Sequence, residues 1–272
     1  MSNSEYANQP KIYTVLEGSR LVYYQIDNHD IPEELWAAHW ESQPHDRDFY
    51  SRFERGYLSV YSSIFRNHLP TKGKILEAGC GRGQFVVALN SLGYDCTGID
   101  FAASTVDQIK SIFKDLPVRQ GNVLELPCAD NSLSAYISLG VVEHFEDGPE
   151  TALSEAYRVI KPGGIGIITV PINNGLRQRS AIEKSQLPDD ARFYQYAFQK
   201  REFSSLLSEV GFKFDKFYAQ GLYYSLRSGI PGFASLTKRI PLLRVIDRVT
   251  DRTPLTKYFG RTGIWIVRKP VV

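Results

Sequence analysis

Apolar and polar positions follow two alternating patterns through the middle of the chain, between Lys74 and Val210. Short apolar runs predict buried strands at 75–76, 94–100, 118–120, 133–139 and 165–170. Between these runs, apolar residues recur at helical spacing and predict helices at 85–92, 104–113, 152–160 and 201–210. Two further strands are expected at 212–221 and 263–267. Strands that alternate with helices in this way predict a parallel sheet with helices on both faces.

The first strand of this series turns directly into a helix through three closely spaced glycines, Gly79, Gly81 and Gly83. Such a turn lets the backbone approach a ligand closely and presents free N–H groups at a helix N-terminus. The pattern therefore predicts a nucleotide-binding turn. It differs from a dinucleotide fingerprint at Gln84, and it lacks the G-K-[ST] ending of a P-loop. Glu77, at the end of the strand, would repel a pyrophosphate and suits a cationic ligand.

A second carboxylate, Asp100, stands at the end of the next predicted strand. Its spacing of about twenty residues from the glycine turn is the one at which an acid binds a ribose diol in doubly wound folds. The alternative is that Asp100 caps the helix expected from Ala102 to Phe113, and the two roles are compatible. Together with the glycine turn, Asp100 predicts a ligand that carries a ribose.

At these residues the chain resembles the class I S-adenosylmethionine-dependent methyltransferases, and within them the ubiquinone-methyltransferase-like, or type 11, small-molecule group. The resemblance is clear over residues 74–171 and rests on four blocks: ILEAGCGRG, GID, GNVLELPCADNSLSAYISLGVVEHFED and RVIKPGGIGIITVP. It implies a Rossmann-like, doubly wound α/β fold with a seven-stranded sheet whose last strand is antiparallel. Helical caps are expected on the N-terminal and C-terminal sides.

The resemblance also implies S-adenosylmethionine as the methyl donor and assigns contacts to it. The three glycines are expected to lie beneath the donor, while Glu77 faces its ammonium group, directly or through water. Asp100 is expected to hold the two ribose hydroxyls. Phe101 and Leu139 are further donor contacts that the resemblance implies.

Asn122 and the amide of Val123 are the residues expected at the adenine. Members of the family usually carry Asp at the position of Asn122, where the side chain accepts a hydrogen bond from the adenine amino group. An asparagine can still accept through its carbonyl oxygen. The alternative is that Asn122 is only a turn residue, because a Gly-Asn pair favours turns.

His144 is the candidate general base. It follows the fourth predicted strand, Leu133 to Leu139, near the point where a doubly wound sheet binds its ligands. A histidine there could remove a proton from the methyl acceptor at neutral pH. The alternative is that His144 orients its loop or contacts the methionine part of the donor, since relatives with different chemistry also carry a histidine here. The neighbouring Glu143 has the same two interpretations.

The chain is expected to have two parts, an N-terminal extension and a methyltransferase domain. We expect an N-terminal extension and lid over residues 1–70, in which residues 12–26 form a small hairpin. The methyltransferase domain is expected over residues 71–272, with insertions at 172–199 and 222–262. Long insertions in compact domains are usually functional, so both insertions are candidates for acceptor binding.

Candidate acceptor-binding residues come from the extension and from the first insertion. In related methyltransferases the segment before the first strand often covers the donor, and the lid candidates here are Trp40, Tyr50 and Arg52. The aromatic second half of the 172–199 insertion adds Arg192, Tyr194 and Tyr196. The alternative in both places is that these residues pack in the core.

The second insertion, 222–262, is basic and contains an apolar stripe at helical spacing, formed by Leu242, Val245, Ile246 and Val249. Arginines flank this stripe. The pattern fits a helical cap docked on the sheet. It also fits an interfacial helix in peripheral contact with anionic lipid, or a pocket for substrates that carry a phosphate.

Composition narrows the remaining possibilities. The chain has 272 residues, 43% of them hydrophobic, and a net charge of +2, which does not suggest nucleic acid as a partner. Three cysteines without paired spacing are expected to be reduced thiols in a cytoplasmic protein. No apolar run approaches the roughly eighteen residues of a membrane helix, the N-terminus is polar rather than a signal peptide, and no motif predicts a metal site.

The function expected from these patterns is methyl transfer from S-adenosylmethionine to a small-molecule or lipid-linked or sugar-linked acceptor. A hydroxyl oxygen is the favoured nucleophile because a residue that could accept its proton stands nearby. One alternative is carbon methylation of a quinone-like ring. A second is a non-catalytic protein that binds S-adenosylmethionine, since a fold does not fix a function. A dehydrogenase is disfavoured by Gln84 and Glu77.

Overall fold

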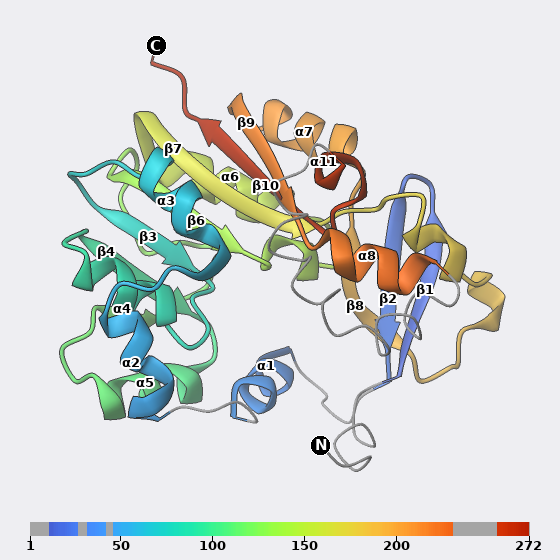
Figure 1. The fold of residues 1–272 in the computed structure, drawn as a ribbon, viewed down its shortest axis with the longest axis horizontal. Coiled ribbons are helices and arrows are strands. Elements are labelled where there is room, and N and C mark those ends of the chain that lie inside the picture. Colours follow the sequence, from blue (N-terminus) through green and yellow to red (C-terminus); the bar gives the residue numbers. More distant parts are fainter. Residues whose placement is uncertain (1–10, 27–31, 42–45, 231–254, 272) are drawn as a thin grey trace.

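A seven-stranded sheet forms the centre of the structure (Figure 1). The structure, a computed structural model, describes residues 11–26, 32–41, 46–230 and 255–271. The strand order is β5-β4-β3-β6-β7-β10-β9. The strands are β3 (Ile75–Ala78), β4 (Cys96–Asp100), β5 (Val118–Gln120), β6 (Leu133–Leu139), β7 (Ile160–Pro171), β9 (Lys213–Gln220) and β10 (Thr262–Arg268). The strands from β5 to β7 pair in parallel, whereas β10 is antiparallel to both of its neighbours, which confirms the predicted topology.

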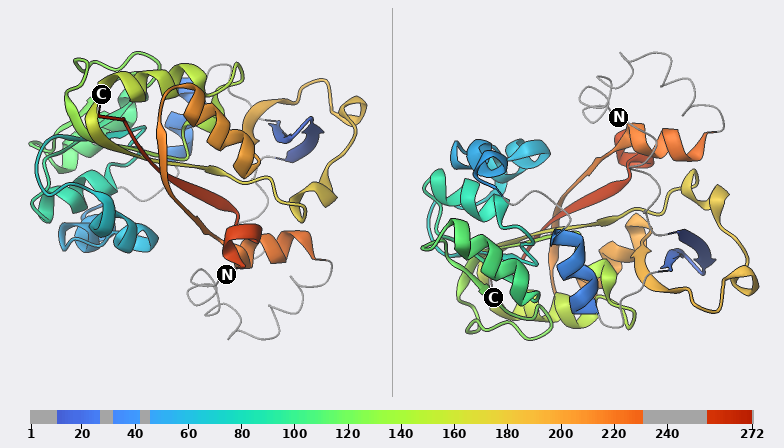
Figure 2. Two further views of the ribbon diagram at one scale, coloured as in Figure 1. Left: turned by 90° about the horizontal axis from the view of Figure 1, so that it is seen from above. Right: turned by 90° about the horizontal axis from the view of Figure 1, so that it is seen from below.

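Helices pack on both faces of this sheet (Figure 2). Along each strand, successive side chains point to opposite faces. Ile75, Ile137 and Ile167 accordingly enter one hydrophobic cluster, whereas their neighbours Leu76, Tyr136 and Ile168 enter the other. The described helices are α1 (Pro32–Glu41), α2 (Arg47–Glu54), α3 (Ser62–His68), α4 (Gln84–Ser91), α5 (Ala103–Ile112), α6 (Glu150–Val159), α7 (Lys200–Glu209), α8 (Leu222–Gly229) and α11 (Thr256–Phe259).

A second, three-stranded sheet combines segments that are far apart in the sequence. The predicted hairpin is present as β1 (Ile12–Glu17) and β2 (Arg20–Gln25), and β2 also pairs with β8 (Arg192–Ala197). Strand β8 belongs to the first predicted insertion and was expected only as an aromatic segment. The N-terminal extension and the 172–199 insertion therefore share one folding element, which lies beside the main sheet (Figure 1).

Two consecutive asparagines after β7 join the small sheet and the C-terminal insertion to the main sheet. Both are buried, with 6% of each residue exposed. Asn173 Nδ2 donates to the carbonyl oxygen of Ser19 at the hairpin turn (2.7 Å). Asn174 Nδ2 donates to the carbonyl oxygens of Phe259 (3.2 Å) and Gly260 (3.0 Å). The end of β7 is thus the point where three parts of the chain meet.

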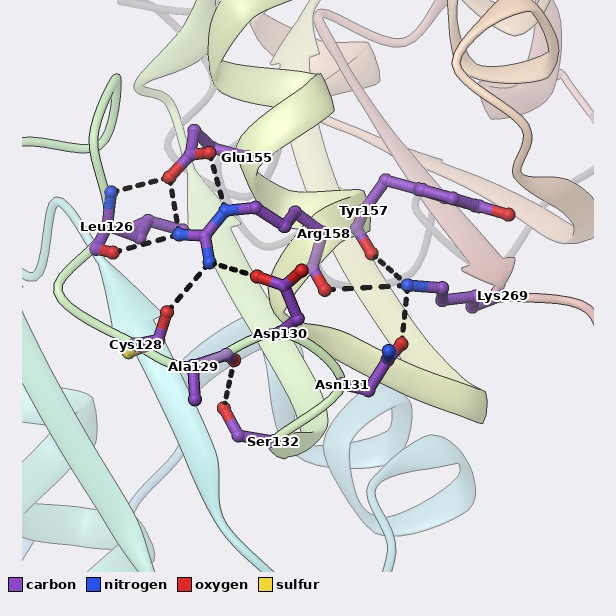
Figure 3. Close-up of polar contacts among 10 residues, drawn as sticks. All are labelled: Leu126, Cys128, Ala129, Asp130, Asn131, Ser132, Glu155, Tyr157, Arg158 and Lys269. Atoms are coloured by element: carbon purple, nitrogen blue, oxygen red, sulfur yellow. Dashed lines mark hydrogen bonds and ion pairs between the residues drawn. The ribbon is translucent and has the colours of Figure 1, made fainter.

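A polar network near the C-terminal end of α6 fixes the long loop that follows β5 (Figure 3). The Arg158 guanidinium donates to the Glu155 and Asp130 carboxylates and to the carbonyl oxygens of Leu126 and Cys128. Lys269, on the segment after β10, donates to the carbonyl oxygen of Tyr157 in α6 and to Asn131 Oδ1 in the same loop. This network holds the loop whose first residues face the site described below.

The C-terminal insertion is helical where it is described, in α8 and α11. The apolar stripe from Leu242 to Val249 and its flanking arginines lie outside the described residues.

Asn174→Ala should lower the free energy of unfolding by about 1–3 kcal/mol, because buried carbonyl groups would lose their donor. Urea unfolding of the purified protein measures this change. Ser111→Ala, on the exposed side of α5, is the control and should stay within about 0.5 kcal/mol of the wild type. An unchanged stability of Asn174→Ala would mean that this junction does not depend on its side chain.

Candidate functional site

The glycine turn between β3 and α4 forms the floor of the site. Gly79 and Gly81 have φ angles of +71° and +49°, which other residues adopt only with strain. A Cβ atom on Gly79 would lie 2.5 Å from Val141 Cγ2, and one on Gly81 would lie 2.6 Å from Trp40 Cζ2. Both the conformation and the surrounding space therefore require glycine at these two positions. Gly83, the third glycine, is the N-terminal cap of α4.

Glu77, at the end of β3, faces a cavity with an unsatisfied carboxylate oxygen. Only 3% of its side chain is exposed, and Oε2 has no hydrogen-bond partner among the described residues. Burial, with a smaller contribution from the charge of Asp100, raises the pKa of Glu77 to about 8. A buried carboxyl that has no partner is stabilised in its charged form by a cation. The geometry of Glu77 therefore suits a positively charged ligand group.

Asp100, at the end of β4, connects the glycine turn to the loop after its own strand. Its Oδ2 accepts a hydrogen bond from the Gly81 amide (2.8 Å), and its Oδ1 accepts one from the Ala102 amide (3.1 Å). Burial raises the pKa of Asp100, while these amide donors act in the opposite direction. Each carboxylate oxygen accepts more than one hydrogen bond, so both retain capacity for hydroxyl groups of a ligand.

These residues line a cavity of about 560 Å³. Small-molecule sites span roughly 300–1,000 Å³, so the cavity has the size of such a site. Ten of the predicted site residues lie in its wall: Trp40, Glu77, Gly79, Gly81, Asp100, Phe101, Asn122, Val123, Leu139 and His144. They come from α1 and from the carboxyl ends of β3, β4, β5 and β6. The sheet thus gathers at one edge residues that are distant in the sequence.

The structure favours the turn interpretation of Asn122 without removing this residue from the site. Asn122 Oδ1 accepts a hydrogen bond from the Leu124 amide (2.9 Å). This is the local side-chain contact that makes asparagine common in turns. The side chain still lines the cavity beside Val123, and its amide nitrogen and second oxygen lone pair are not used by this contact.

His144 lies in the short 3₁₀ helix η3 (Val142–His144) and has a fixed orientation. Its Nδ1 lies 2.8 Å from the carbonyl oxygen of Tyr194. Because a carbonyl oxygen only accepts, Nδ1 carries the proton and Nε2 is the ring nitrogen with the lone pair. The ring also makes edge contacts with Trp36 (4.6 Å between centroids) and with Tyr194 (5.1 Å).

The charge state of His144 follows from this environment. Burial is the main cause that lowers its pKa to about 4, which outweighs the opposing effect of the Tyr194 carbonyl. The imidazole is therefore neutral at pH 7. A neutral ring whose Nδ1 proton is held by a carbonyl presents Nε2 as a proton acceptor.

Tyr194 reaches His144 through an irregularity in the small sheet. The pairing of β2 with β8 shifts register between Tyr23 and Tyr24, so that Tyr194 is the extra residue of a β-bulge. Bulges of this kind re-aim a side chain and are common next to active sites. Here the bulge directs the Tyr194 carbonyl to His144 and its ring to Trp36, 6.5 Å away between centroids.

Four other predicted acceptor-side residues lie away from the cavity. Tyr50 is completely buried among the helices, where its hydroxyl donates to the carbonyl oxygen of Arg82 (2.7 Å). Arg52 is exposed and lies over the Phe53 ring. The Tyr196 hydroxyl donates to the carbonyl oxygen of Glu146 (2.8 Å), and Arg192 is exposed at the beginning of β8. The structure does not bring these four side chains to the cavity wall, because each serves local packing or faces solvent, and their roles at an acceptor stay predictions.

The cavity wall also contains residues that were not selected from the sequence. Trp36 is one helical turn before Trp40, and this spacing on one face of α1 was the available signal. Tyr61 enters the wall from the residues before α3, and its hydroxyl accepts a hydrogen bond from Gln220 Nε2 (3.2 Å). Only the tertiary structure brings Tyr61 to β9, so no local pattern indicated it.

Glu143, beside His144, is a second buried carboxyl. Only 2% of its side chain is exposed, and Oε2 has no hydrogen-bond partner among the described residues. Burial raises its pKa to about 8. Unlike Glu77, it does not line the cavity.

Within the described part of the chain, no helix has the length and apolar character needed to cross a membrane. In the same residues, no cluster of three or more histidine, cysteine, aspartate or glutamate side chains could hold a metal ion.

Comparisons with known proteins agree with this geometry. The methyltransferase domain family matches residues 76–168, from β3 into β7. A probable S-adenosylmethionine-dependent methyltransferase of Mycolicibacterium smegmatis is 32% identical over 97 residues, which are 36% of this chain and 37% of that protein. A second such protein, of Mycobacterium tuberculosis, is 25% identical over 142 residues, 52% of this chain and 49% of its own length. The chain thus spans less than half the length of these two relatives.

Among solved structures, the putative methyltransferase in complex with the Haloferax volcanii Trm112 methyltransferase activator has the same fold. It superposes with a TM-score of 0.58 at 17% identity, over 88% of this chain and 96% of that chain. At this identity the likeness concerns the fold alone.

The buried Glu143 predicts a stability that falls with pH. The unfolded chain ionises this carboxyl above its ordinary pKa of 4.5, whereas the folded protein keeps it protonated up to about pH 8. The unfolded state then binds fewer protons, so the free energy of unfolding falls as the pH rises through this window. Glu143→Gln removes the effect. Relative to the wild type, its stability should rise by more than about 1 kcal/mol between pH 5 and 8, since one pKa unit is worth about 1.4 kcal/mol.

Urea unfolding of the ligand-free protein at several pH values measures this difference. Glu209→Gln, at an exposed position of α7, is the matched control and should follow the wild type across the range. Parallel pH profiles for Glu143→Gln and the wild type would contradict a protonated, buried Glu143.

Proposed function

This chain belongs to the class I S-adenosylmethionine-dependent methyltransferases of the type 11 group, and we propose that it methylates a hydroxyl oxygen of a small-molecule or amphipathic acceptor. The family match covers β3 to β7, the part of the fold that carries the glycine turn and His144. The observation that carries the choice of a hydroxyl oxygen is the neutral His144, whose Nδ1 is bound by a backbone carbonyl at the cavity wall.

The cavity fits the donor of this family, S-adenosylmethionine, by three features. Among the residues that the structure describes, the Glu77 carboxylate has an oxygen without a hydrogen-bond partner, where a cationic ammonium group is expected. Gly79 and Gly81 leave backbone exposed where a Cβ would fill the floor. Asp100 retains acceptor capacity for ribose hydroxyls, and Asn122 and Val123 would contact the adenine. When bound, the donor supplies a methyl group on a sulfonium sulfur, which a nucleophile displaces in line.

In this proposal the protein aligns the acceptor, excludes water and removes one proton. Trp36 and Trp40 supply an apolar cover on the α1 side of the cavity. His144 Nε2 accepts the hydroxyl proton as the new oxygen–carbon bond forms. A pKa of about 4 makes His144 a weak base. It remains adequate, because a hydroxyl becomes strongly acidic while its oxygen is being alkylated. Alignment of the reacting groups supplies roughly 7–11 kcal/mol of barrier reduction.

Two other parts of the proposal concern location and partners. Cys80, Cys96 and Cys128 are free thiols, and the first two are buried, which supports a reducing compartment such as the cytoplasm. The C-terminal insertion is proposed to contact an amphipathic acceptor or a membrane surface. No role for nucleic acid is proposed, since the net charge is only +2.

The donor assignment predicts the effect of Asp100→Ala. This change should weaken the binding of S-adenosylhomocysteine, the demethylated donor, by about 1–3 kcal/mol, because ribose hydroxyls would be buried without an acceptor. Calorimetric titration measures the affinity. Asp95→Ala, an exposed aspartate before β4, is the control and should bind normally. Normal binding by Asp100→Ala would remove the ribose assignment.

The base assignment predicts that His144→Ala lowers turnover by about 10²–10⁴-fold with little change in donor affinity. Turnover is measured with methyl-labelled donor and a cell extract as the source of acceptor, followed by partition between organic and aqueous phases. Label in the organic phase indicates a lipid or quinone acceptor, and label in the aqueous phase indicates a sugar or another polar metabolite.

A loss confined to donor affinity would make His144 a binding residue. Full turnover by His144→Ala would favour carbon methylation with a different proton acceptor. Donor binding without label from any extract would favour the non-catalytic alternative.

A further inference from the structure

Two arginines from different insertions converge on the residue that follows β7. Arg177 Nη1 donates to the carbonyl oxygen of Ile172 (3.1 Å), and the amide of Ile172 donates to the carbonyl oxygen of Arg261 (2.8 Å). Ile172 stands at the carboxyl end of a central strand, the edge of the sheet at which α/β folds bind ligands. The pair is therefore on the same edge as Glu77, Asp100 and the cavity.

The positions of both arginines are fixed by the backbone around them. Asn174 Oδ1 accepts a hydrogen bond from the Arg177 amide (3.2 Å), and Asn174 Nδ2 donates to the Gly260 carbonyl (3.0 Å) just before Arg261. Gly221 has a φ of +78°, and a Cβ there would lie 3.1 Å from Arg261 Cβ. The glycine thus leaves room for Arg261 beside β9. These contacts fix the backbone of both arginines and, through Ile172, the side chain of Arg177.

The two arginines differ in burial. Arg177 is buried, with 8% of the residue exposed, and its guanidinium lies 5.0 Å from the centroid of the Tyr23 ring. Burial lowers the pKa of Arg177, and the charge of Arg261 lowers it further. Arg261 is exposed and forms no ion pair with the described residues. An anion bound between two cations would offset the electrostatic cost of holding them near each other.

Two connections lead from this pair to the cavity. The carbonyl oxygen of Gln220 accepts a hydrogen bond from the Arg261 amide (2.8 Å), and Gln220 Nε2 donates to the hydroxyl of Tyr61 in the cavity wall (3.2 Å). On the other side, the charge of Arg261 lowers the pKa of Tyr194, although burial raises it overall. Tyr194 in turn contacts His144. The Arg261 backbone is therefore connected through Gln220 to Tyr61 in the cavity wall.

Resting on the proposed methyl transfer, we infer that the acceptor carries an anionic group, a carboxylate or a phosphate, which binds to Arg261 and Arg177 at the end of β7. The guanidinium fork suits both groups because it donates two parallel hydrogen bonds. An anion held there fixes one end of the acceptor. Its hydroxyl is then positioned at His144 by binding energy that comes from a part of the molecule remote from the reaction.

The test uses the full chain saturated with S-adenosylhomocysteine and three probes: inorganic phosphate, benzoate and the neutral analogue benzyl alcohol. The protein should bind phosphate or benzoate, and it should bind benzyl alcohol at least about tenfold more weakly. Titration calorimetry measures these affinities. Arg261→Ala should weaken the binding of the anionic probe by about tenfold or more. Arg261→Lys should have an intermediate affinity, because lysine keeps the charge without the guanidinium fork. Lys257→Ala removes a charge from the same insertion at an exposed position and should stay within about twofold of the wild type.

Binding of phosphate alone would identify a phosphorylated acceptor, and binding of benzoate alone would identify a carboxylic acid. The inference is overturned if the wild type binds neither anion, or if Arg261→Ala binds the anion as the wild type does. An equal loss in Lys257→Ala would mean a diffuse charge effect and would also overturn it. Binding of S-adenosylhomocysteine in the same titration separates these outcomes from a failure of the proposed function, in which the donor product itself would not bind.

Discussion

The hydrogen bond from the Gly81 amide to Asp100 Oδ2 joins the two loops on which the donor side of the site depends. It holds the turn after β3 against the end of β4, and Asp100 Oδ1 extends the connection to the Ala102 amide at the cap of α5. Both strands are buried and pair in parallel, so their carboxyl ends coincide. One carboxylate therefore sets the spacing of the glycine turn and at the same time faces the cavity.

Two buried carboxyls, one in the cavity wall and one behind it, cost stability in the absence of ligand. Glu77 and Glu143 each have an oxygen without a hydrogen-bond partner in the described part of the chain, and burial raises the pKa of both to about 8. A protonated carboxyl minimises that cost. A cationic ligand would reverse it for Glu77, which lies in the cavity wall. Burial also lowers the pKa of His144 and keeps its ring neutral. The same physical cause therefore leaves Glu77 able to bind a cation and His144 able to accept a proton.

Local patterns in the sequence predicted the helices, strands and turns that are determined by residues close together along the chain. The glycine turn, the strands from β3 to β7 and the hairpin at 12–26 are confirmed, because spacing and glycine positions encode them directly. Strand β8 was missed because its partner, β2, is distant in the sequence. The bulge at Tyr194 exists only through that pairing. Tyr50 was a lid candidate, with core packing as the alternative, because an aromatic residue fits either place; its complete burial and its hydrogen bond to Arg82 put it among the helices.

The contacts that local patterns missed are the tertiary ones that build the proposed acceptor side. A strand from one insertion, a hairpin from the N-terminal extension and the end of the other insertion meet at Asn173 and Asn174. Each of these segments contributes one residue. Tyr194 of β8 contacts His144, Tyr23 of β2 contacts Arg177, and Arg261 directly precedes β10. The donor side depends on a turn that the chain forms by itself, whereas the acceptor side depends on tertiary contacts between insertions. Changes in those insertions would therefore alter the proposed acceptor side while leaving the hydrogen bond between Gly81 and Asp100, and the donor contacts proposed for them, in place.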